Sequence, residues 1–539
     1  MSKIKYKSGK IILQKIGALF KNYPKEPFCF HVFLFAIYPI LFLYSHNIVE
    51  LYAIEIIMPM LAILGFAIYS LIVLNRWLGD IYRSGIMVTM FLILFFSFGH
   101  SVDLIINFRL NLGLFSLGAA EIVCIVYAVI FILGIRYLLR TKKNLKNITN
   151  YLNIAAGLLI VISLYNIISY EIKGVTLSEN VEKKDSEKVT AKDIDPTNLP
   201  DVYYIILDGY GRSDILKKMY GYDNSKFTNN LKEQGFYVAP KARSNYCQTQ
   251  LSLASSMNID YLDNLTNQWK DLGKLINSGK VIKTFKANNY QTVAFSTGYT
   301  ATEITNADIY FKTRGALSEF ENILINTTPI RLVMEQSEDI SQYDLHRRQV
   351  INTLDSLPRI AKIKNPTFTF AHVVMPHPPF VFDENGKEID PKRSFAFSDG
   401  NHLVQRPNNK RNAGKLTPEE YREKYKKQLI FISDKIKTII ERIIDKSEKP
   451  PIIILQADHG PGSMLDWHSA ENTNFTERLS ILNAYYLPGV KKGLYKNITP
   501  VNTFRFIFNK YFGINYKLLK DKSYYSTKSE PFVYIDIDK

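Results

Sequence analysis

Acidic and histidine side chains follow three apolar runs in the part of the sequence after residue 200. VYYIIL is followed by Asp208, HVVMP is followed by His377, and IIIL is followed, after two intervening residues, by Asp458 and His459. If these runs are parallel strands, their carboxyl ends share one edge of a sheet and the side chains converge there. Carboxylates and imidazoles together are the ligands expected for zinc or manganese. The pattern therefore predicts a divalent-metal site assembled from distant segments of the chain.

Short buried strands that alternate with helices are the elements that must hold these residues. The predicted strands are continuous apolar runs, typical of sheets buried on both faces, and they cover residues 202–207, 292–295, 367–374 and 451–455. A helix is predicted from Thr417, because Thr417 and Glu420 can form a capping box around the first-turn Pro418. The alternation predicts an α/β domain with a doubly wound, mostly parallel sheet.

The first part of the chain has a different composition, dominated by long apolar runs. Because a spanning helix needs about 20 mostly apolar residues, about five transmembrane helices are predicted, over residues 28–45, 51–74, 85–100, 113–139 and 152–170. Basic residues crowd the N-terminal tail and the connections after the second and fourth runs. This charge bias predicts a cytoplasmic N-terminus. An odd number of crossings then places the rest of the chain outside.

This topology predicts a multi-span helical membrane anchor over residues 1–170, an extracytoplasmic linker over 171–200 and the α/β domain over 201–539. The predicted location is the cytoplasmic (inner) membrane, with a multi-pass anchor and an extracytoplasmic catalytic domain. The net charge of +17 could suggest nucleic acid. However, no basic stripe with interleaved aromatic residues occurs in a soluble segment, so no nucleic-acid partner is predicted.

Six ordered motifs carry a resemblance to a known superfamily: DVYYIILDGYGR, SNYCQTQLSLASSMN, FSTGY, HVVMPHPPF, ILQADHG and RLSILNAYYLPG. The chain resembles the alkaline-phosphatase/sulfatase superfamily. Within it, the chain is similar to the membrane-bound branch that contains lipoteichoic acid synthases and lipid A phosphoethanolamine transferases. The resemblance covers the anchor and essentially all of residues 200–539.

The resemblance implies metal ligands and catalytic residues at defined positions. Thr249 matches the nucleophile, because it stands nine residues before Asn258, as in the synthases, and opens a helix-like run. A helix N-terminus there would favour a phosphoryl oxygen. The implied metal ligands are Asp208, Thr249, Asp458 and His459, and the implied catalytic residues are Thr249, His377 and His468.

The implied reaction is metal-dependent transfer of a phospholipid-derived group, phosphoglycerol or phosphoethanolamine, through a phosphothreonine intermediate. The implied cofactor is a divalent metal, zinc or manganese, with magnesium as a third choice. In the implied mechanism, metal coordination would lower the pKa of the Thr249 hydroxyl, whose alkoxide would attack phosphorus. The implied partners are a membrane phospholipid donor and an envelope glycan, polymer or lipid acceptor.

Two other functions stay open from the sequence. A membrane-anchored hydrolase of phosphodiesters, phosphate esters or sulfate esters would use the same residues, because pocket shape selects between an alcohol and water as acceptor. A non-catalytic, sulfatase-like membrane scaffold is the second alternative, although the intact set of ligands argues against it.

Cys247 is interpreted as an unmodified side chain near the pocket, and His372 as a residue packed in the core. Sulfatases mature a cysteine to formylglycine within Cys-x-Pro/Ala-x-Arg, and the sequence after Cys247, QTQL, lacks both the small residue or proline and the arginine. His372 alternates with apolar residues in its predicted strand, which favours packing in the core over catalysis.

Overall fold

The computed structural model describes residues 26–48, 51, 53–105, 108–111, 116–178, 199–313, 315, 317–336, 341–391, 395–406, 412 and 414–538. The chain forms two compact units. The first, called here the membrane unit, contains Met1–Ile172 and Phe320–Met334. The second, called here the α/β unit, contains Lys173–Glu319 and Glu335–Lys539.

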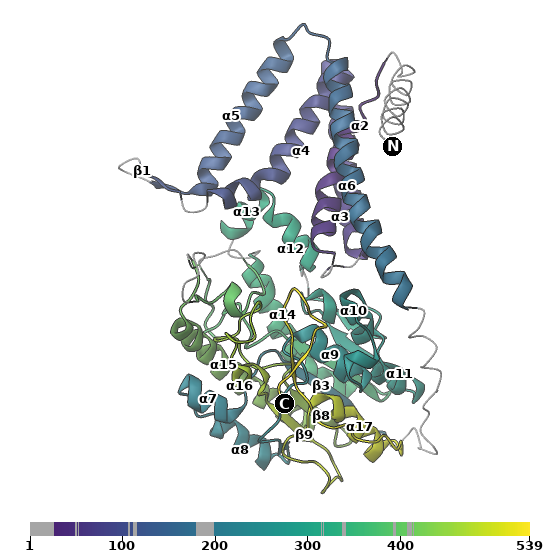
Figure 1. Ribbon diagram of the computed structural model, residues 1–539, viewed down its shortest axis with the longest axis vertical. Coiled ribbons are helices and arrows are strands. Elements are labelled where there is room, and N and C mark those ends of the chain that lie inside the picture. The colour runs from purple at the N-terminus through teal and green to yellow at the C-terminus, as the bar shows by residue number, and fades with distance from the viewer. Residues whose placement is uncertain are drawn as a thin grey trace, which may run out of the picture. The chain divides into compact units, whose positions relative to one another are not determined.

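Long apolar helices make up most of the membrane unit (Figure 1). They are α2 (Phe30–His46), α3 (Ile57–Leu78), α4 (Ile81–Leu104), α5 (Ala119–Arg140) and α6 (Lys146–Ser178). A 3₁₀ turn, η1 (Ala53–Ile56), precedes α3, and the strand pair β1 (Leu110–Asn111) and β2 (Ser116–Leu117) precedes α5.

Four helices in the described part of the chain are long and apolar enough to cross a membrane: Ala53–Leu78, Ile81–Leu104, Ala119–Arg140 and Lys146–Tyr170. They correspond to the second to fifth predicted spans. The first predicted span corresponds to α2, an apolar helix of 17 residues, which is at the lower limit of about 17 for a span. Helix α6 continues to Ser178, so the beginning of the predicted linker is helical. The linker residues 179–198 lie outside the described part of the chain.

The segment Phe320–Met334 belongs to the membrane unit although it interrupts the sequence of the α/β unit. It includes most of α12 (Glu319–Asn326) and α13 (Ile330–Gln336). Phe320 and Leu324 are buried in one hydrophobic cluster with Val32 of α2 and Leu92 of α4. Because this burial removes apolar surface from water, it holds the segment against the anchor helices.

Gly99 of α4 is the point of closest approach to this segment. Its backbone N–H donates to the carbonyl oxygen of Thr327 over 2.9 Å. A Cβ atom on Gly99 would lie 2.0 Å from the carbonyl oxygen of Asn326. Glycine is therefore required for this contact. An ion pair between Arg331 and Asp103, with an N–O distance of 3.6 Å, lies close by in sequence.

A seven-stranded sheet forms the centre of the α/β unit, in the order β4-β9-β8-β3-β7-β5-β6. The strands from β8 to β6 are parallel, and β9 and β4 continue the sheet in antiparallel fashion. This confirms the predicted mostly parallel sheet. The strands are β3 (Val202–Leu207), β4 (Tyr237–Val238), β5 (Gln291–Phe295), β6 (Ile309–Phe311), β7 (Thr367–Val373), β8 (Ile452–Gln456) and β9 (Asn483–Tyr486).

Two groups of helices accompany the sheet (Figure 1). Helices α9 (Thr249–Asn258), α10 (Trp269–Asn277), α11 (Lys280–Ala287) and α17 (Pro500–Tyr511) contact one another as the first group. The second group consists of α7 (Ser213–Tyr220), α8 (Ser225–Glu233), α14 (Gln342–Ser356) and α15 (Pro418–Lys446). Helix α15 begins with the predicted capping box of Thr417 and Glu420.

Shorter elements complete the α/β unit. Helix α16 (Phe475–Leu479) lies between β8 and β9 in sequence, and β10 (Tyr524–Tyr525) pairs with β11 (Ile535–Asp536) near the C-terminus. The 3₁₀ turns are η4 (Leu262–Asn264), η5 (Thr300–Thr302), η6 (Leu357–Lys362) and η7 (Gly400–His402).

Candidate metal centre and nucleophile

The predicted ligands follow adjacent strands at the centre of the sheet. Strand β3 lies between β8 and β7. Asp208 directly follows β3, and Asp458 and His459 come shortly after β8. The amide of Asp208 donates to the carbonyl of Val373, and the amide of His377 donates to the carbonyl of Asp208, each over 3.0 Å. These backbone hydrogen bonds hold the end of β3 against the loop that follows β7.

Four side chains direct one polar atom each toward the same small region. Nε2 of His459 lies 3.0 Å from Oγ1 of Thr249, 3.3 Å from Oδ2 of Asp458 and 3.5 Å from Oδ1 of Asp208. All four residues are buried. Zinc is bound by such oxygen and nitrogen donors in sets of four.

Two of these atoms are buried carboxylate oxygens without a hydrogen-bond donor in the described part of the chain. Among the described residues, neither Oδ1 of Asp208 nor Oδ2 of Asp458 has a hydrogen-bond partner. Burying an ionised carboxylate oxygen without a partner is unfavourable, so this arrangement requires compensating positive charge. The donor set therefore fits a divalent cation.

The other atom of each ligand is held by a neighbouring group. Oδ2 of Asp208 lies 3.2 Å from Nε2 of His372, and Oδ1 of Asp458 accepts from the N–H of Gly209 over 3.2 Å. Nδ1 of His459 lies 2.9 Å from the carbonyl oxygen of Gly460. This contact places the imidazole proton on Nδ1 and leaves the Nε2 lone pair available for a metal.

His372 combines the predicted burial with a second role. It is 2% exposed, as expected for a core residue. Its two ring nitrogens lie within hydrogen-bond distance of Thr302 and Asp208. It therefore orients one metal-ligand candidate, a role that its alternation with apolar residues did not reveal.

Charges around the donor set favour an ionised carboxylate and a neutral imidazole. Burial raises the pKa of Asp208, but the nearby imidazoles of His377, His372 and His459 outweigh burial and hold that pKa below its ordinary value. Burial, followed by the positive charge of Arg478, lowers the pKa of His459. These protonation states are the ones that metal ligation requires.

Thr249 is the first residue of α9, so its hydroxyl lies at the positive end of the helix dipole. The hydroxyl of Ser252 in the same helix donates to the carbonyl of Asp458 over 2.7 Å, which ties α9 to the segment after β8. Asn258 closes α9, and its side chain bonds the backbone of Leu275 and Lys280. The nine-residue offset from Thr249 to Asn258 therefore reflects the length of this helix.

Cys247 occupies a different environment from Thr249. Its thiol is fully buried, donates to the carbonyl of Ser526 over 3.5 Å, and packs with Leu465, Leu479 and Tyr525. Burial raises the pKa of the thiol. The side-chain oxygen of Thr249 therefore lies beside His459, whereas the sulfur of Cys247 contacts Ser526.

A buried ion pair connects the segments that carry the candidate nucleophile and ligands. Nη1 of Arg478 lies 2.6 Å from Oδ2 of Asp399. Arg478 also donates to the carbonyls of Cys247 and Gly460, over 2.8 Å and 3.1 Å. Arg478 opens the motif RLSILNAYYLPG, which was a usable sequence signal, whereas Asp399 lies in a loop without one.

The two predicted catalytic histidines have different positions. The ring of His377 lies 5.9 Å from that of His459, and its Nε2 is 3.7 Å from Oδ2 of Asp399. His468 is exposed, and its ring lies 5.8 Å from that of His402. The structure therefore brings His377 to the donor set and leaves His468 outside it.

No curated protein matches the chain. The C-terminal periplasmic domain of EcEptC from Escherichia coli, in complex with Zn, is 9% identical with a TM-score of 0.41; 65% of this chain and 96% of that chain are covered. The integral membrane protein lipooligosaccharide phosphoethanolamine transferase A from Neisseria meningitidis is 10% identical with a TM-score of 0.33; the coverages are 85% and 88%.

A third similar structure is the phosphonate monoester hydrolase of Agrobacterium radiobacter, 11% identical with a TM-score of 0.37, covering 61% of this chain and 80% of that chain. The family model described as Sulfatase matches residues 200–504, more than half of the 539-residue chain. The chain belongs to the sulfatase family.

Proposed function

We propose that this sulfatase-family enzyme is a membrane-anchored phosphotransferase. It moves a phospholipid-derived group, phosphoglycerol or phosphoethanolamine, onto an envelope glycan, polymer or lipid. The observation that carries the proposal is the Thr249 hydroxyl at the N-terminus of α9, 3.0 Å from Nε2 of His459 and beside two buried carboxylates. The choice of transferred group follows the motif resemblance to lipoteichoic acid synthases and phosphoethanolamine transferases.

Asp208, Thr249, Asp458 and His459 would hold a divalent cation, zinc or manganese, or magnesium. When bound, such a cation lowers the pKa of a coordinated hydroxyl and offsets negative charge on phosphoryl oxygens. The amide groups at the N-terminus of α9 add partial positive charge in the same place.

Two displacements at phosphorus account for transfer. In the first, the deprotonated Oγ1 of Thr249 attacks phosphorus, the bond to the diacylglycerol oxygen breaks, and protonated His377 gives that oxygen a proton. In the second, His377 takes the proton of the acceptor hydroxyl, the acceptor oxygen bonds phosphorus, and Oγ1 of Thr249 leaves. His468 is the alternative acid or base, although it lies outside the donor set.

The membrane unit supports transfer over hydrolysis, because it keeps the catalytic groups on a chain that is anchored among lipids. In the proposed topology the basic N-terminus is cytoplasmic, α2 counts as the first of five crossings, and the α/β unit is extracytoplasmic.

Substitution of the candidate nucleophile tests the proposal. Thr249→Ala is expected to lower lipid turnover at least about a thousandfold, because a catalytic nucleophile is removed. The measurement is transfer from phosphatidylglycerol and from phosphatidylethanolamine by the full chain in native membranes, with peptide mass mapping for a phosphoester on Thr249. Full turnover by Thr249→Ala would reject the nucleophile assignment.

Cys247→Ser is the matched variant two residues earlier. Its hydroxyl can still donate to the carbonyl of Ser526, so turnover should change less than about tenfold. Loss of all activity in Cys247→Ser, together with formylglycine at that position and sulfate-ester cleavage by the wild type, would instead identify a hydrolase.

A further inference from the structure

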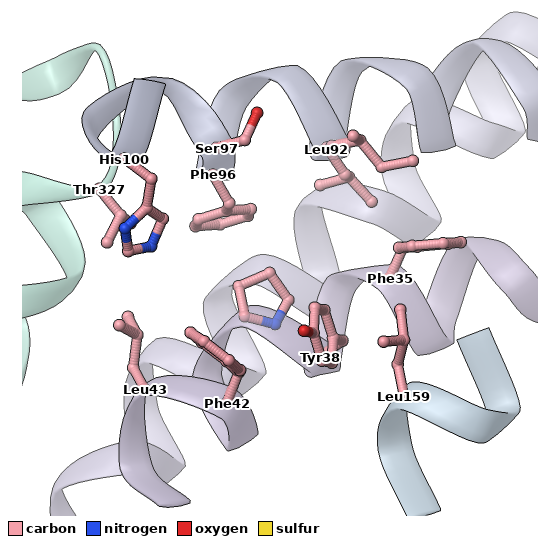
Figure 2. Close-up of a pocket in the computed structure, with 12 residues that line it drawn as sticks. Phe35, Tyr38, Phe42, Leu43, Leu92, Phe96, Ser97, His100, Leu159 and Thr327 are labelled. Carbon is pink, nitrogen blue, oxygen red and sulfur yellow. The ribbon is translucent and has the colours of Figure 1, made fainter. Parts of the chain in front are cut away.

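The membrane unit contains a cavity of about 380 Å³ between α2, α4 and α6. Figure 2 shows Tyr38 and Phe42 of α2 on one side of this space and Phe96 and Leu92 of α4 on the other. The volume lies within the range of about 300–1,000 Å³ that is usual for ligand pockets.

The two ends of the cavity differ in polarity. Phe35 and Leu159 lie at one end, and His100 and Thr327 lie together at the other (Figure 2). The Thr327 hydroxyl already donates to the carbonyl of Leu324 over 2.7 Å. The imidazole of His100 is exposed, so it can donate a hydrogen bond to a phosphate or ester oxygen.

The polar end belongs to the outer half of the membrane in the proposed topology. With a cytoplasmic N-terminus, α2 runs outward, α3 runs inward and α4 runs outward again. His100 lies near the C-terminal end of α4, which ends at Leu104. Leu159 lies in the middle part of α6, about 20 Å of helix beyond its first residue, Lys146. The cavity thus extends from the outer surface toward the bilayer centre, as an acyl chain does.

Another face of α6 is exposed. Leu158, Val161 and Ile162 are each about 60% exposed on this helix, so they meet the surrounding lipid. Aromatic and aliphatic walls hold water poorly and accept apolar guests. A phospholipid meets both requirements, because its acyl chain is apolar and the glycerol to which that chain is esterified carries ester and phosphate oxygens.

We infer that this cavity binds one acyl chain of the phospholipid donor, with the glycerol end of that lipid at His100. The inference deepens the proposed function and rests on it for the identity of the lipid as donor. It adds a substrate-binding site in the membrane unit, which the catalytic residues do not reveal.

Photochemical labelling tests the site directly. The full chain is placed in phosphatidylcholine nanodiscs with phosphatidylethanolamine or phosphatidylglycerol that carries a diazirine midway along one acyl chain. After irradiation, peptide mass mapping should find the label on residues 35–42 and 92–96. Leu159→Trp fills the inner end and should lower this labelling at least about fivefold, because overpacking excludes the chain.

Leu158→Trp is the matched control, because it makes the same change at the neighbouring, lipid-facing position. It should leave labelling within about twofold of the wild type, since exposed substitutions have small effects. Ile93 of α4 also lines the cavity, so Ile93→Trp provides a second filling variant. Gel filtration checks that each variant is folded.

The outcomes separate the site from the reaction. Unchanged labelling in folded Leu159→Trp and Ile93→Trp would overturn the inference, as would lost labelling with normal lipid turnover. Thr249→Ala should be labelled like the wild type while turnover is lost. Labelling of the cavity without any transfer by the wild type would reject the proposed function and support the acyl-chain site.

Discussion

Asp399 and Arg478 form an ion pair from which water is excluded, since each side chain is 2% exposed. Arg478 also bonds the carbonyls of Cys247 and Gly460, which flank the candidate nucleophile and His459 in sequence. Burial raises the pKa of Asp399, but Arg478 and His377 outweigh burial and lower it. The carboxylate therefore stays ionised, and the guanidinium depends on it for compensation.

Removing this carboxylate charge should destabilise the α/β unit. For Asp399→Asn we expect a loss of about 3–5 kcal/mol, because an uncompensated buried charge is left on Arg478. The measurement is the thermal transition of the detergent-solubilised full chain. Asp214→Asn, which breaks the more exposed pair with Arg212, serves as the control. It should cost less than about 1 kcal/mol. Equal losses in the two variants would contradict the role of Asp399.

The burial of His346 makes the free energy of unfolding depend on pH. It is 1% exposed, its ring packs against Phe395 and Phe397, and burial lowers its pKa to about 3. In the unfolded chain a histidine has a pKa of about 6.5. Between these values the unfolded state binds a proton that the folded state does not, so stability falls as pH decreases below about 6.5.

Replacing His346 by an aromatic hydrocarbon should remove this contribution. His346→Phe keeps an aromatic ring against Phe395 and Phe397. It should flatten the loss of stability by about 1.4 kcal/mol per pH unit between about pH 6 and pH 4. Chemical denaturation at several pH values measures this slope, and parallel curves for the variant and the wild type would show that His346 does not contribute.

Individual residues of the candidate site differed in how far the sequence could reveal them. Asp208, Asp458 and His459 follow continuous apolar runs, so the geometry of a parallel sheet was enough to predict their convergence. Thr249 required the motif resemblance, because a threonine before a helix is ordinarily a cap. Asp399 could not be predicted from the sequence, because it lies in a loop and its partner Arg478 is 79 residues away.

At the scale of elements, four strands of the central sheet, β3, β5, β7 and β8, were predicted to within one residue at each end, since uninterrupted apolar runs mark strands covered on both faces. The shorter strands β4, β6 and β9 were not predicted. The segment FENILINTTPIRLVM, residues 320–334, was not separated from the α/β domain. It is too short to span a bilayer and has the pattern of an ordinary amphipathic helix. What distinguishes it is its partner, the helices of the membrane unit, and a partner is not visible in local sequence.

Gly99 should control the docking of this segment. Gly99→Ala places a methyl group 2.0 Å from the carbonyl oxygen of Asn326, so the backbone must separate. We expect tryptic cleavage at Arg331 to become about tenfold faster, in line with the usual cost of overpacking. Limited proteolysis in nanodiscs measures the rate. Gly157→Ala, where a Cβ has open space, is the control and should leave the rate unchanged.

At the scale of the whole molecule, α2 decides the side of the membrane on which the enzyme acts. Four long spans alone would return the chain to the side of the N-terminus, whereas α2 as a further crossing places the termini on opposite sides. We expect an N-terminal tag to be protected in intact cells and a C-terminal reporter to be active outside.

Deletion of residues 26–48 should remove the external C-terminal signal, because it removes one crossing. An external N-terminal tag on the intact chain would contradict this topology. The positive-inside argument supports the prediction, since basic residues crowd the tail before α2.

The placement of Phe320–Met334 also bears on how such a protein can be recombined. The chain passes between its two compact units three times, after Ile172, after Glu319 and after Met334. A single cut near residue 200 would leave Phe320 and Leu324 without the apolar surface that covers them. A chimera that exchanges only the residues before this cut must therefore supply helices with a matching apolar surface for Phe320 and Leu324. The anchor helices and the segment Phe320–Met334 must therefore be exchanged together.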